Sequence, residues 1–387
     1  MGFGQPSPHS LYAELRTEAP VHPGAPHLGA PGNHDGTPTT FSVYGYDAAV
    51  EVLLDTGTFS SSAHADLAGT VMGRSVIEMD PPEHRSYRAL LQPSLGPKTM
   101  ARWQKSVVTP LLEEMITNLR PAGRDNLVRG FLFDFPMRTF AAMLGLPKSQ
   151  YAEFHYAAIE LITLVADPVK GKASAGALGD MFATVLTDRR IAPRDDLISV
   201  LAHAEHDGQR LTDEEIYSFL RLLLPAGAET TYRSSSTLLA ALFANPDQLE
   251  LVRDDPAALT AAVNEVNRWE TPLQFVPRRA TRDTEVAGVA IPRGSTVVVV
   301  LGAANRDPSR WENPDRFDLR RPHRPAIAFG HGAHLCIGKH LSNLETESLV
   351  HALLELPNVR LNPDAETPTI EGTLMRSPSR LEVVWDV

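Results

Sequence analysis

Residues 328–341 read AFGHGAHLCIGKHL, and this stretch holds Cys336, the only cysteine among the 387 residues of the chain. Three glycines surround the thiol: Gly330, Gly332 and Gly338. They allow the backbone to turn tightly and to approach a flat ligand without a clash from Cβ atoms. The apolar pattern predicts a helix from Ile337 to about Leu356, so Cys336 lies directly before a helix N-terminus. Free N–H groups and the helix dipole favour a thiolate there, which is the form that binds metals.

The residues around Cys336 are compatible with four interpretations. A buried, inert thiol is the commonest role of a free cysteine. A zinc site could form with His331 and His334, although closed zinc sites normally take ligands from two segments. A nucleophile paired with a histidine would need an orienting Asn or Asp, which the sequence does not identify. The fourth interpretation is the proximal thiolate ligand of a haem.

Composition narrows the class of protein. Hydrophobic residues make up 43% and charged residues 21%, as in ordinary globular proteins. The net charge of −11 argues against a nucleic-acid partner, and one cysteine excludes an internal disulfide framework. The chain shows neither a signal peptide nor a run approaching the ~18 apolar residues that a membrane span needs. We therefore expect a soluble, cytoplasmic enzyme with no membrane partner.

The order of patterns along the chain predicts one α+β domain, mainly α with small β-sheets, over residues 1–387. We expect residues 1–36, rich in Pro, Gly and His, to be an extended N-terminal segment, and residues 59–75 to be a long loop. Residues 47–54 read as a helix with Asp47 as N-cap. After Pro272 the β-branched segments predict strands: Glu285–Ile291, Ser295–Leu301 and short pieces around 368–385.

The longest predicted helix runs from Thr212 to Ala244. It opens with TDEE, a capping box that pairs Thr212 with Glu215, and Asn245-Pro246 ends it. Pro225 removes one N–H from the helical ladder, which predicts a kink just before Gly227. A second helix is predicted from Pro256 to Trp269.

The motif Phe329-x-x-Gly332-x-His334-x-Cys336-x-Gly338 resembles the haem-binding signature of the cytochrome P450 family. Further motifs follow in the family's order, so that the resemblance spans at least residues 80–338. It implies the P450 fold, in which haem b lies between a long central helix and the helix after the cysteine loop. Cys336 would then be the iron ligand, and other residues of the loop would contact the cofactor: Phe329, Gly330, His334 and Gly338.

The resemblance also implies groups that bind the haem propionates. His84 and Arg88 in MDPPEHRSYRALL are four residues apart and share one helix face. Without the resemblance this pair would read as a solvated surface. His334 and an arginine of VPRRATRD match two further partners, and the spacing to Gly288 favours Arg278 over Arg279.

Two more motifs match the family. Glu265-x-x-Arg268 resembles a structural ion pair, which we expect to join Arg316 of the NPDRF segment and to hold the irregular region before the cysteine loop. In the long helix, Ala226 and Gly227 leave room beside a planar cofactor. The adjacent Glu229 and Thr230 resemble the acid–alcohol pair that manages proton delivery. A helical Thr230 can also bond the carbonyl four residues back.

The resemblance implies a haem-thiolate monooxygenase that activates O2 and oxidises a small apolar organic molecule. Electrons would come from an external ferredoxin or flavodoxin with its reductase. Against the net charge of −11, these basic residues would form the docking face: Arg85, Arg102, Lys105, Lys339 and His340. A peroxide-driven oxidase and a non-catalytic haem sensor are the alternatives. The Glu229–Thr230 pair argues against both.

The substrate class is predicted as apolar: a terpenoid, steroid, fatty acid, polyketide or aromatic compound. Each wall residue could equally belong to the core. By position in the family, the expected pocket residues are Leu224, Ala228, Leu273, Phe275, Val276 and Met375.

Overall fold

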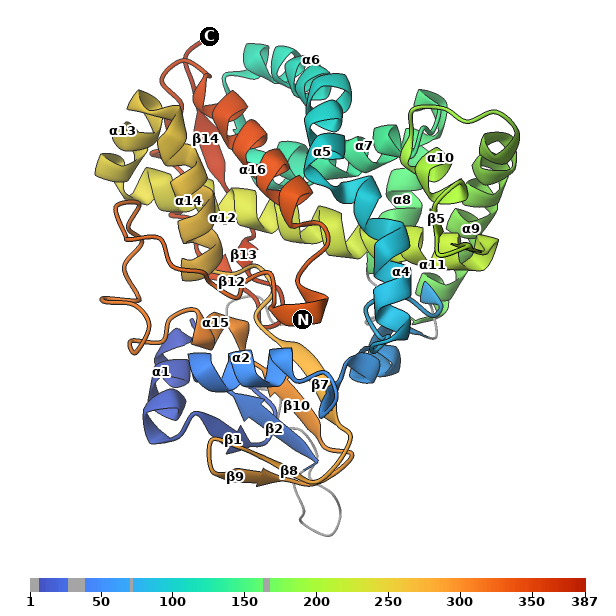
Figure 1. Ribbon diagram of the computed structural model, residues 1–387. Helices are drawn as coiled ribbons and strands as arrows, with labels where there is room; N and C mark the ends of the chain where they lie inside the picture. Colours follow the sequence, from blue (N-terminus) through green and yellow to red (C-terminus); the bar gives the residue numbers. More distant parts are fainter. Residues whose placement is uncertain (1–6, 27–38, 70–71, 163–167) are drawn as a thin grey trace.

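The structure is a computed structural model that describes residues 7–26, 39–69, 72–162 and 168–387 (Figure 1). Helices form most of the molecule, and the largest sheet lies at one end of it, as Figure 1 shows. The expectation of a mainly α fold with small β-sheets is confirmed. Within the described residues, no helix is long and apolar enough to cross a membrane.

The α-helices follow one another with short connections through most of the chain. Their bounds are α1 His9–Glu18, α2 Tyr46–Leu54, α4 Glu83–Leu91, α5 Pro97–Trp103, α6 Thr109–Leu119, α7 Asp134–Met143, α8 Tyr151–Ile162, α9 Pro168–Ile191, α10 Leu197–Ala202, α11 Asp213–Leu223, α12 Thr230–Ala244, α13 Pro246–Asp254, α14 Pro256–Trp269, α15 Leu301–Ala304 and α16 Lys339–Leu354. Short 3₁₀ and π turns join several of them, of which η1 (Ser61–His64), η2 (Ala65–Gly69), η9 (Leu224–Glu229) and η10 (Gly332–His334) matter below.

The largest sheet has five strands in the order β1-β2-β10-β7-β3, and all its neighbouring pairs are antiparallel except the parallel pair β2–β10. Its strands are β1 Val21–Pro23, β2 Thr40–Val43, β3 Phe59–Ser60, β7 Val276–Ala280 and β10 Thr296–Val299. The smaller sheets are β11 Arg360–Leu361 with β14 Glu382–Val384 and β4 Arg124–Asn126, β12 Ile370–Glu371 with β13 Ser377–Pro378, β5 Glu205–His206 with β6 Gln209–Arg210, and β8 Thr284–Val286 with β9 Val289–Ile291.

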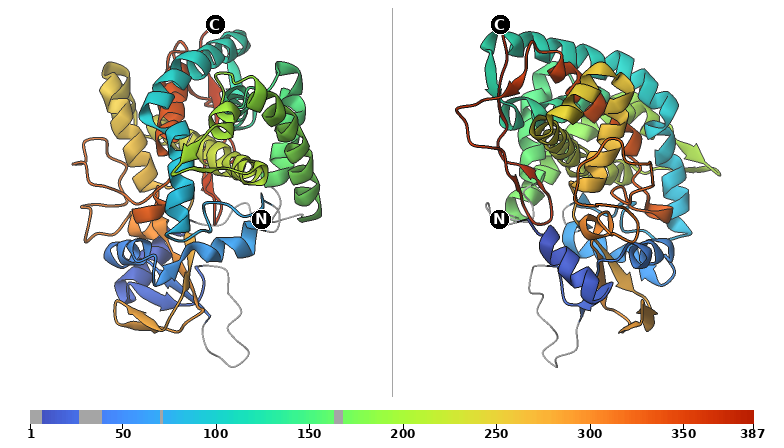
Figure 2. Two further views of the ribbon diagram at one scale, coloured as in Figure 1. Left: turned by 45° about the vertical axis from the view of Figure 1, so that its right-hand side comes forward. Right: turned by 90° about the vertical axis from the view of Figure 1, so that its left-hand side faces the viewer.

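The long predicted helix exists as one helical run, α11–η9–α12, through the middle of the molecule (Figures 1 and 2). Thr212 and Glu215 form the predicted capping box, and the run ends at Ala244 as expected. The kink predicted from Pro225 takes the form of π-helical turns over Leu224–Glu229. Because proline has no backbone N–H to donate to the helical hydrogen bonds, the helix widens locally at that point.

Packing around α12 explains why this run is central. Its leucines are buried against α14 and α16, and the residues that form this contact include Leu238, Leu239, Leu242, Val263, Val266, Leu349 and Val350. Pro256 starts α14, where the side chain of Asp255 accepts a hydrogen bond from the Ala257 N–H at 2.8 Å. The helix predicted from Pro256 to Trp269 is therefore confirmed in its bounds.

Four local expectations are wrong. The expected extended segment 1–36 contains α1, whose His9 is buried against Glu270; residues 1–6 and 27–36 lie outside the described part. In place of one strand over 285–291, β8 and β9 form a hairpin. Ala287 and Gly288 adopt positive φ between its strands, which a tight hairpin turn requires.

The loop expected over 59–75 contains β3 and the short turns η1 and η2, and residues 70–71 lie outside the described part. The side chain of Asp80 fixes the start of this segment, because it accepts hydrogen bonds from the Ser61 N–H at 2.8 Å and from the Ser60 hydroxyl. Asp47 lies in the first turn of α2, where its charge favours the helix dipole, and Gly45 is the N-cap.

Candidate active site

The loop that carries Cys336 folds back on itself just before α16. The Cys336 N–H donates to the Phe329 carbonyl at 2.8 Å, and the Leu335 N–H donates to the Gly332 carbonyl at 3.1 Å. Gly330 and Gly332 have φ of +73° and +70°, the left-handed region in which side chains with Cβ are strained. A Cβ on Gly332 would also lie 3.0 Å from the Leu53 carbonyl. This glycine therefore allows close approach to the end of α2.

The Cys336 thiol is exposed, yet protein surrounds it closely enough for burial to raise its pKa. Hydrogen bonds from the backbone near Gly338 and Lys339, and the charges of Arg88 and Lys339, act in the opposite direction. A thiol that is accessible while protein encloses it lies in the wall of a concave surface. The predicted position before a helix N-terminus is confirmed, since α16 begins at Lys339.

The structure brings together the four basic residues expected to bind propionates. His84 and Arg88 lie on α4, Arg278 on β7 and His334 on η10. The rings of His84 and His334 are 4.0 Å apart between centroids. The guanidinium of Arg88 donates to the Leu335 carbonyl at 2.6 Å, which joins α4 to the cysteine loop. Segments that are far apart in the sequence thus form one cationic cluster, defined here as His84, Arg88, Arg278 and His334.

The cationic cluster has buried donors and acceptors that no described residue satisfies. Both ring nitrogens of His84, Nε2 of His334 and Nε of Arg278 have no hydrogen-bond partner in the described part of the chain. Native proteins bond most buried polar atoms, because an unpaired one costs about 1–3 kcal/mol. The cluster is therefore complete only when a further polar group is bound.

Electrostatics indicate that the missing group is an anion. Burial lowers the pKa of Arg278 to about 10, and burial with the neighbouring bases lowers the pKa of His334 to about 3. Burial and the charge of Arg88 also lower the pKa of His84. A carboxylate would reverse the repulsion and use the unpaired atoms. A haem supplies a metal for the Cys336 thiol and two carboxylates for the cationic cluster, so the residues present fit that group.

Successive side chains of strand β7 point to opposite faces of the sheet, and this decides between Arg278 and Arg279. The side chain of Arg278 is buried, and Val297 is its partner in β10. Arg279 points to the other face, where it forms an ion pair with Asp66 and donates to the Gly294 carbonyl at 3.1 Å. Arg278 is therefore the residue that joins the cationic cluster.

The opposite side of the candidate site is η9. Ala226 is exposed although its helical run crosses the middle of the molecule, so it faces an open space. A Cβ on Gly227 would overlap the ring of Phe140 on α7, so this glycine serves close helix packing. The Thr230 hydroxyl donates to the Ala226 carbonyl at 2.8 Å, as predicted for a helical threonine.

Glu229 is not a free carboxylate. Its Oε1 accepts from Nη2 of Arg233 at 2.8 Å, and Nη1 of Arg233 also donates to the Ser377 hydroxyl at 3.1 Å. Sequence reasoning missed Arg233, although the spacing of four residues from Glu229 is the signal of a helical ion pair.

Glu345 on α16 was also missed. Its side chain is fully buried, burial raises its pKa to about 8, and the Thr231 hydroxyl donates to its Oε2 at 3.4 Å. It lies four residues from Leu341 and from Leu349, both of which are buried. That spacing places Glu345 on the buried helix face and could have identified it.

The expected pocket residues divide into two groups. Leu224 and Ala228 are fully buried in the apolar core, whereas Leu273, Phe275, Val276 and Met375 are partly accessible. An isolated bridge pairs Leu273 with Met375, and the Gln274 N–H donates to the Leu374 carbonyl at 2.9 Å. Residues 100 positions apart therefore form one partly apolar wall.

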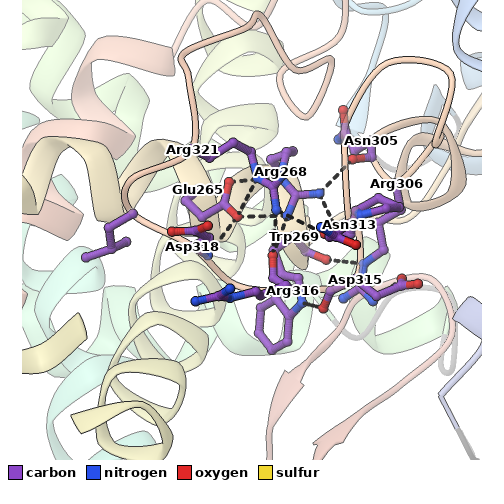
Figure 3. Close-up of polar contacts among 12 residues, drawn as sticks. Glu265, Arg268, Trp269, Asn305, Arg306, Asn313, Asp315, Arg316, Asp318 and Arg321 are labelled. Atoms are coloured by element: carbon purple, nitrogen blue, oxygen red, sulfur yellow. Dashed lines mark hydrogen bonds and ion pairs between the residues drawn. The ribbon is translucent and has the colours of Figure 1, made fainter. Parts of the chain in front are cut away.

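The predicted ion pair of Glu265 and Arg268 is buried and bidentate, with both N···O distances 2.8 Å (Figure 3). Its third partner is Arg321, whose Nε donates to Glu265 at 3.2 Å. The expectation of Arg316 is wrong, because its side chain is exposed and only its carbonyl accepts from Arg268, at 3.1 Å. Arg268 further donates to the Pro314 carbonyl at 2.7 Å. The Glu265 cluster, defined as Glu265, Arg268 and Arg321, thus holds the irregular chain before the cysteine loop.

No group of three or more His, Cys, Asp or Glu side chains within the described residues is placed to hold a metal ion. The zinc site considered for Cys336 with His331 and His334 therefore has no such ligand set there.

Comparisons with known proteins identify the family. Residues 185–385 match the family described as "Cytochrome P450". The chain is 30% identical to "Putative cytochrome P450 YjiB" of Bacillus subtilis (strain 168), over 92% of this chain and 90% of that protein. It is 31% identical to "Cytochrome P450 monooxygenase PikC" of Streptomyces venezuelae, over 98% and 91%. The crystal structure of CYP109E1 from Bacillus megaterium in complex with testosterone superposes with a TM-score of 0.88, at 29% identity, covering 98% of this chain and all of that one.

Proposed function

The chain belongs to the cytochrome P450 family and is a monooxygenase of that family, and from this premise we propose that it binds haem b through Cys336 and oxidises an apolar substrate with O2. Electrons come from a separate ferredoxin or flavodoxin with its reductase, and residues 1–387 act as one domain. The observation that carries the proposal is the accessible Cys336 thiol beside a buried cationic cluster with unpaired atoms.

In this proposal each residue of the site has a defined task. A thiolate-ligated haem supplies the activation of O2 when it is bound. Cys336 ligates the metal, and the cationic cluster binds the carboxylates and so orients the cofactor. Phe329, Gly330 and Gly338 shape the loop that lies against it. On the opposite side Ala226 presents a small side chain, while Gly227 lets η9 pack closely against Phe140.

Proton handling is assigned to Thr230 and Glu229. The Thr230 hydroxyl already donates to the Ala226 carbonyl, so its oxygen remains able to accept a hydrogen bond. Glu229 is held by Arg233, so proton transfer through Glu229 requires that this ion pair loosen or that a water bridge it. Arg233 acts as a positioning residue for Glu229.

The proposed substrate is an apolar molecule of about the size of a steroid. Leu273, Phe275, Val276 and Met375 support an apolar wall, because they are partly accessible and two of them meet in the isolated bridge. The complex of CYP109E1 with testosterone is a further support, since that protein shares the fold over its whole length. Leu224 and Ala228 are buried in the apolar core, so they are not part of this accessible wall.

A basic docking face is proposed on the side of Cys336. Arg85, Lys105 and His340 are exposed, and Lys339 lies over the Phe329 ring at 5.7 Å. Arg102 pairs with Asp195 at 3.1 Å, so its charge is partly neutralised. Both candidate classes of electron donor carry acidic surfaces that such a face would attract.

The deciding experiment is the absorption spectrum of the reduced, carbon-monoxide-bound protein and of the Cys336→Ala variant. We expect a strongly red-shifted Soret band in the wild type and its loss in the variant, because the shift needs a thiolate ligand. A protein that stays colourless after reconstitution with haem contradicts the proposal. Binding of a steroid such as testosterone, followed through the displacement of the iron's water in the visible spectrum, then tests the substrate class.

A further inference from the structure

The turn η1 ends at His64, a residue that the family motifs do not include. Asp80 anchors the start of this turn through the Ser61 N–H and the Ser60 hydroxyl. The turn packs on β7, the strand that carries Arg278. His64 is therefore held in place by a backbone anchor on one side and by the sheet on the other.

His64 faces the cationic cluster directly. Its Nε2 lies 3.4 Å from Nη1 of Arg278. Burial, and to a smaller extent the charge of Arg278, lower the pKa of His64 to about 3. The imidazole of His64 therefore lies beside the cationic cluster, in direct contact with Arg278.

We propose that His64 is a fifth cofactor-binding residue, which donates a hydrogen bond to a haem carboxylate beside Arg278. The inference rests on the proposed function, because it requires that haem is the ligand of the cationic cluster. Nη1 of Arg278 is committed to the Pro277 carbonyl at 2.8 Å, so Arg278 alone does not offer all its donors to the ligand. Nη1 also donates to Nε2 of His64. The N–H of this imidazole is therefore on Nδ1, and it supplies the additional donor.

A purely structural role for His64 makes a different prediction. If the ring only filled space, its removal would weaken the binding of charged and uncharged porphyrins equally. If it binds a carboxylate, its removal matters only when the carboxylate is present. Haem dimethyl ester, in which both carboxylates are esterified, separates these two cases.

The test measures the rate at which cofactor transfers from the protein to apomyoglobin, with native haem and with haem dimethyl ester. Three variants are compared with the wild type: His64→Leu and His64→Phe, which have no hydrogen-bond donor, and His64→Asn, which keeps an amide N–H near the position of Nδ1. His155→Leu is the matched control, because His155 is a half-buried histidine that packs on Phe133, outside the cationic cluster. Far-UV circular dichroism establishes that each variant is folded.

We expect His64→Leu and His64→Phe to lose native haem about tenfold faster, since a hydrogen bond to a charged group contributes about 1.5–3 kcal/mol and 1.4 kcal/mol is a factor of ten. His64→Asn and His155→Leu should remain within about threefold of the wild type on the same scale. With the dimethyl ester the differences should vanish. Unchanged haem loss in both donor-free variants, or equal acceleration with haem and ester, overturns the role of His64. Failure of the wild type to bind haem overturns instead the proposed function.

Discussion

The structure contains two buried charged clusters, the Glu265 cluster and the cationic cluster, and they differ in how completely the described residues satisfy their polar atoms. In the Glu265 cluster, the carboxylate accepts from Arg268, from Arg321 and from the Asp318 N–H at 3.0 Å (Figure 3). In the cationic cluster, both ring nitrogens of His84 and Nε of Arg278 find no partner among the described residues.

The comparison distinguishes a structural cluster from a binding site. Burying a charge is tolerated when an opposite charge and hydrogen bonds compensate it. The Glu265 cluster meets both conditions with its own residues, so it stabilises the fold without a ligand. The cationic cluster meets them only in part, because carbonyls accept from Arg88 and Arg278 while the atoms named above stay unpaired, and in our proposal a bound anion supplies the rest.

The largest effect is expected when the satisfied cluster is broken. Glu265→Ala leaves the buried Arg268 guanidinium without its carboxylate and should destabilise the protein by about 3–5 kcal/mol. Urea denaturation followed by circular dichroism measures this change. Arg316→Ala is the control, because its side chain is exposed, and it should cost less than about 0.5 kcal/mol. Equal losses in the two variants would contradict the assignment of Arg321 as the third partner.

A substitution in the cationic cluster should affect haem binding rather than the stability of the cofactor-free protein. Arg278→Ala removes a base from a repulsive group, so the unfolding free energy of the cofactor-free protein should hardly fall. Haem affinity should drop by about 2–3 kcal/mol, or roughly 30–150-fold, because a charge-assisted bond is lost. Arg279→Ala, which loses the ion pair with Asp66 and the hydrogen bonds to Gly294 and Thr296 on the other face of β7, should bind haem normally. Haem titration of the apoprotein measures both, and similar affinities would refute the cluster.

Glu345 sharpens the comparison because it is a buried acid without a compensating base. Its pKa is raised from 4.5 to about 8, so the folded protein holds a proton that the unfolded chain releases. This contribution to stability is complete below about pH 4.5 and is lost as the pH rises to about 8. From pH 6 to pH 7 the free energy of unfolding falls by at most about 1.4 kcal/mol through this group. Glu345→Gln should therefore show a flatter dependence of the urea midpoint on pH, and an unchanged slope would contradict the raised pKa.

The smallest effect belongs to the exposed charges on the cysteine side. Replacing Lys105 and Lys339 by Gln should slow reduction by the electron donor a few-fold at low salt, since exposed charges contribute less than about 1 kcal/mol each. The difference should shrink at high salt because ions screen the attraction. Stopped-flow reduction at two ionic strengths measures it. A donor that reduces both proteins at equal rates docks on another face.

A more local prediction concerns Pro225, which lies in the first turn of η9. Pro225→Val restores an N–H to the ladder and should let η9 return towards regular α-helix. We expect more of the consumed O2 to appear as peroxide, measured as the peroxide yield per electron donor oxidised. An unchanged yield would show that Pro225 is not needed for the distortion.

Local chemistry explains which parts of the fold and the site could be predicted. The capping box at Thr212, the end of the run at Ala244 and the bond from Thr230 to Ala226 each depend on residues within four positions of one another. The distortion at Pro225 depends on one missing N–H. Such features depend only on residues that are close together in the sequence, and all of them were predicted correctly.

Errors arose where distant segments decide. Helix α1 was missed because its docking depends on His9 meeting Glu270, which is 261 residues away. Arg316 was chosen by its neighbourhood in NPDRF, but the turn from Asn313 to Arg316 directs that side chain outward and Arg321 occupies the place beside Glu265. His64 lies on a segment without periodicity, so only its distance from Arg278 reveals it.

The sequence by itself determined the family, the helical character and the identity of Cys336, His84, Arg88 and His334 as residues of one site, because motif spacing is a property of the chain. Only the tertiary structure decided between Arg278 and Arg279, replaced Arg316 by Arg321 and added His64 and Glu345. Each of these depends on which face of a strand, turn or helix is buried against another segment. Burial and charge compensation act through space, and the linear order of residues does not contain them.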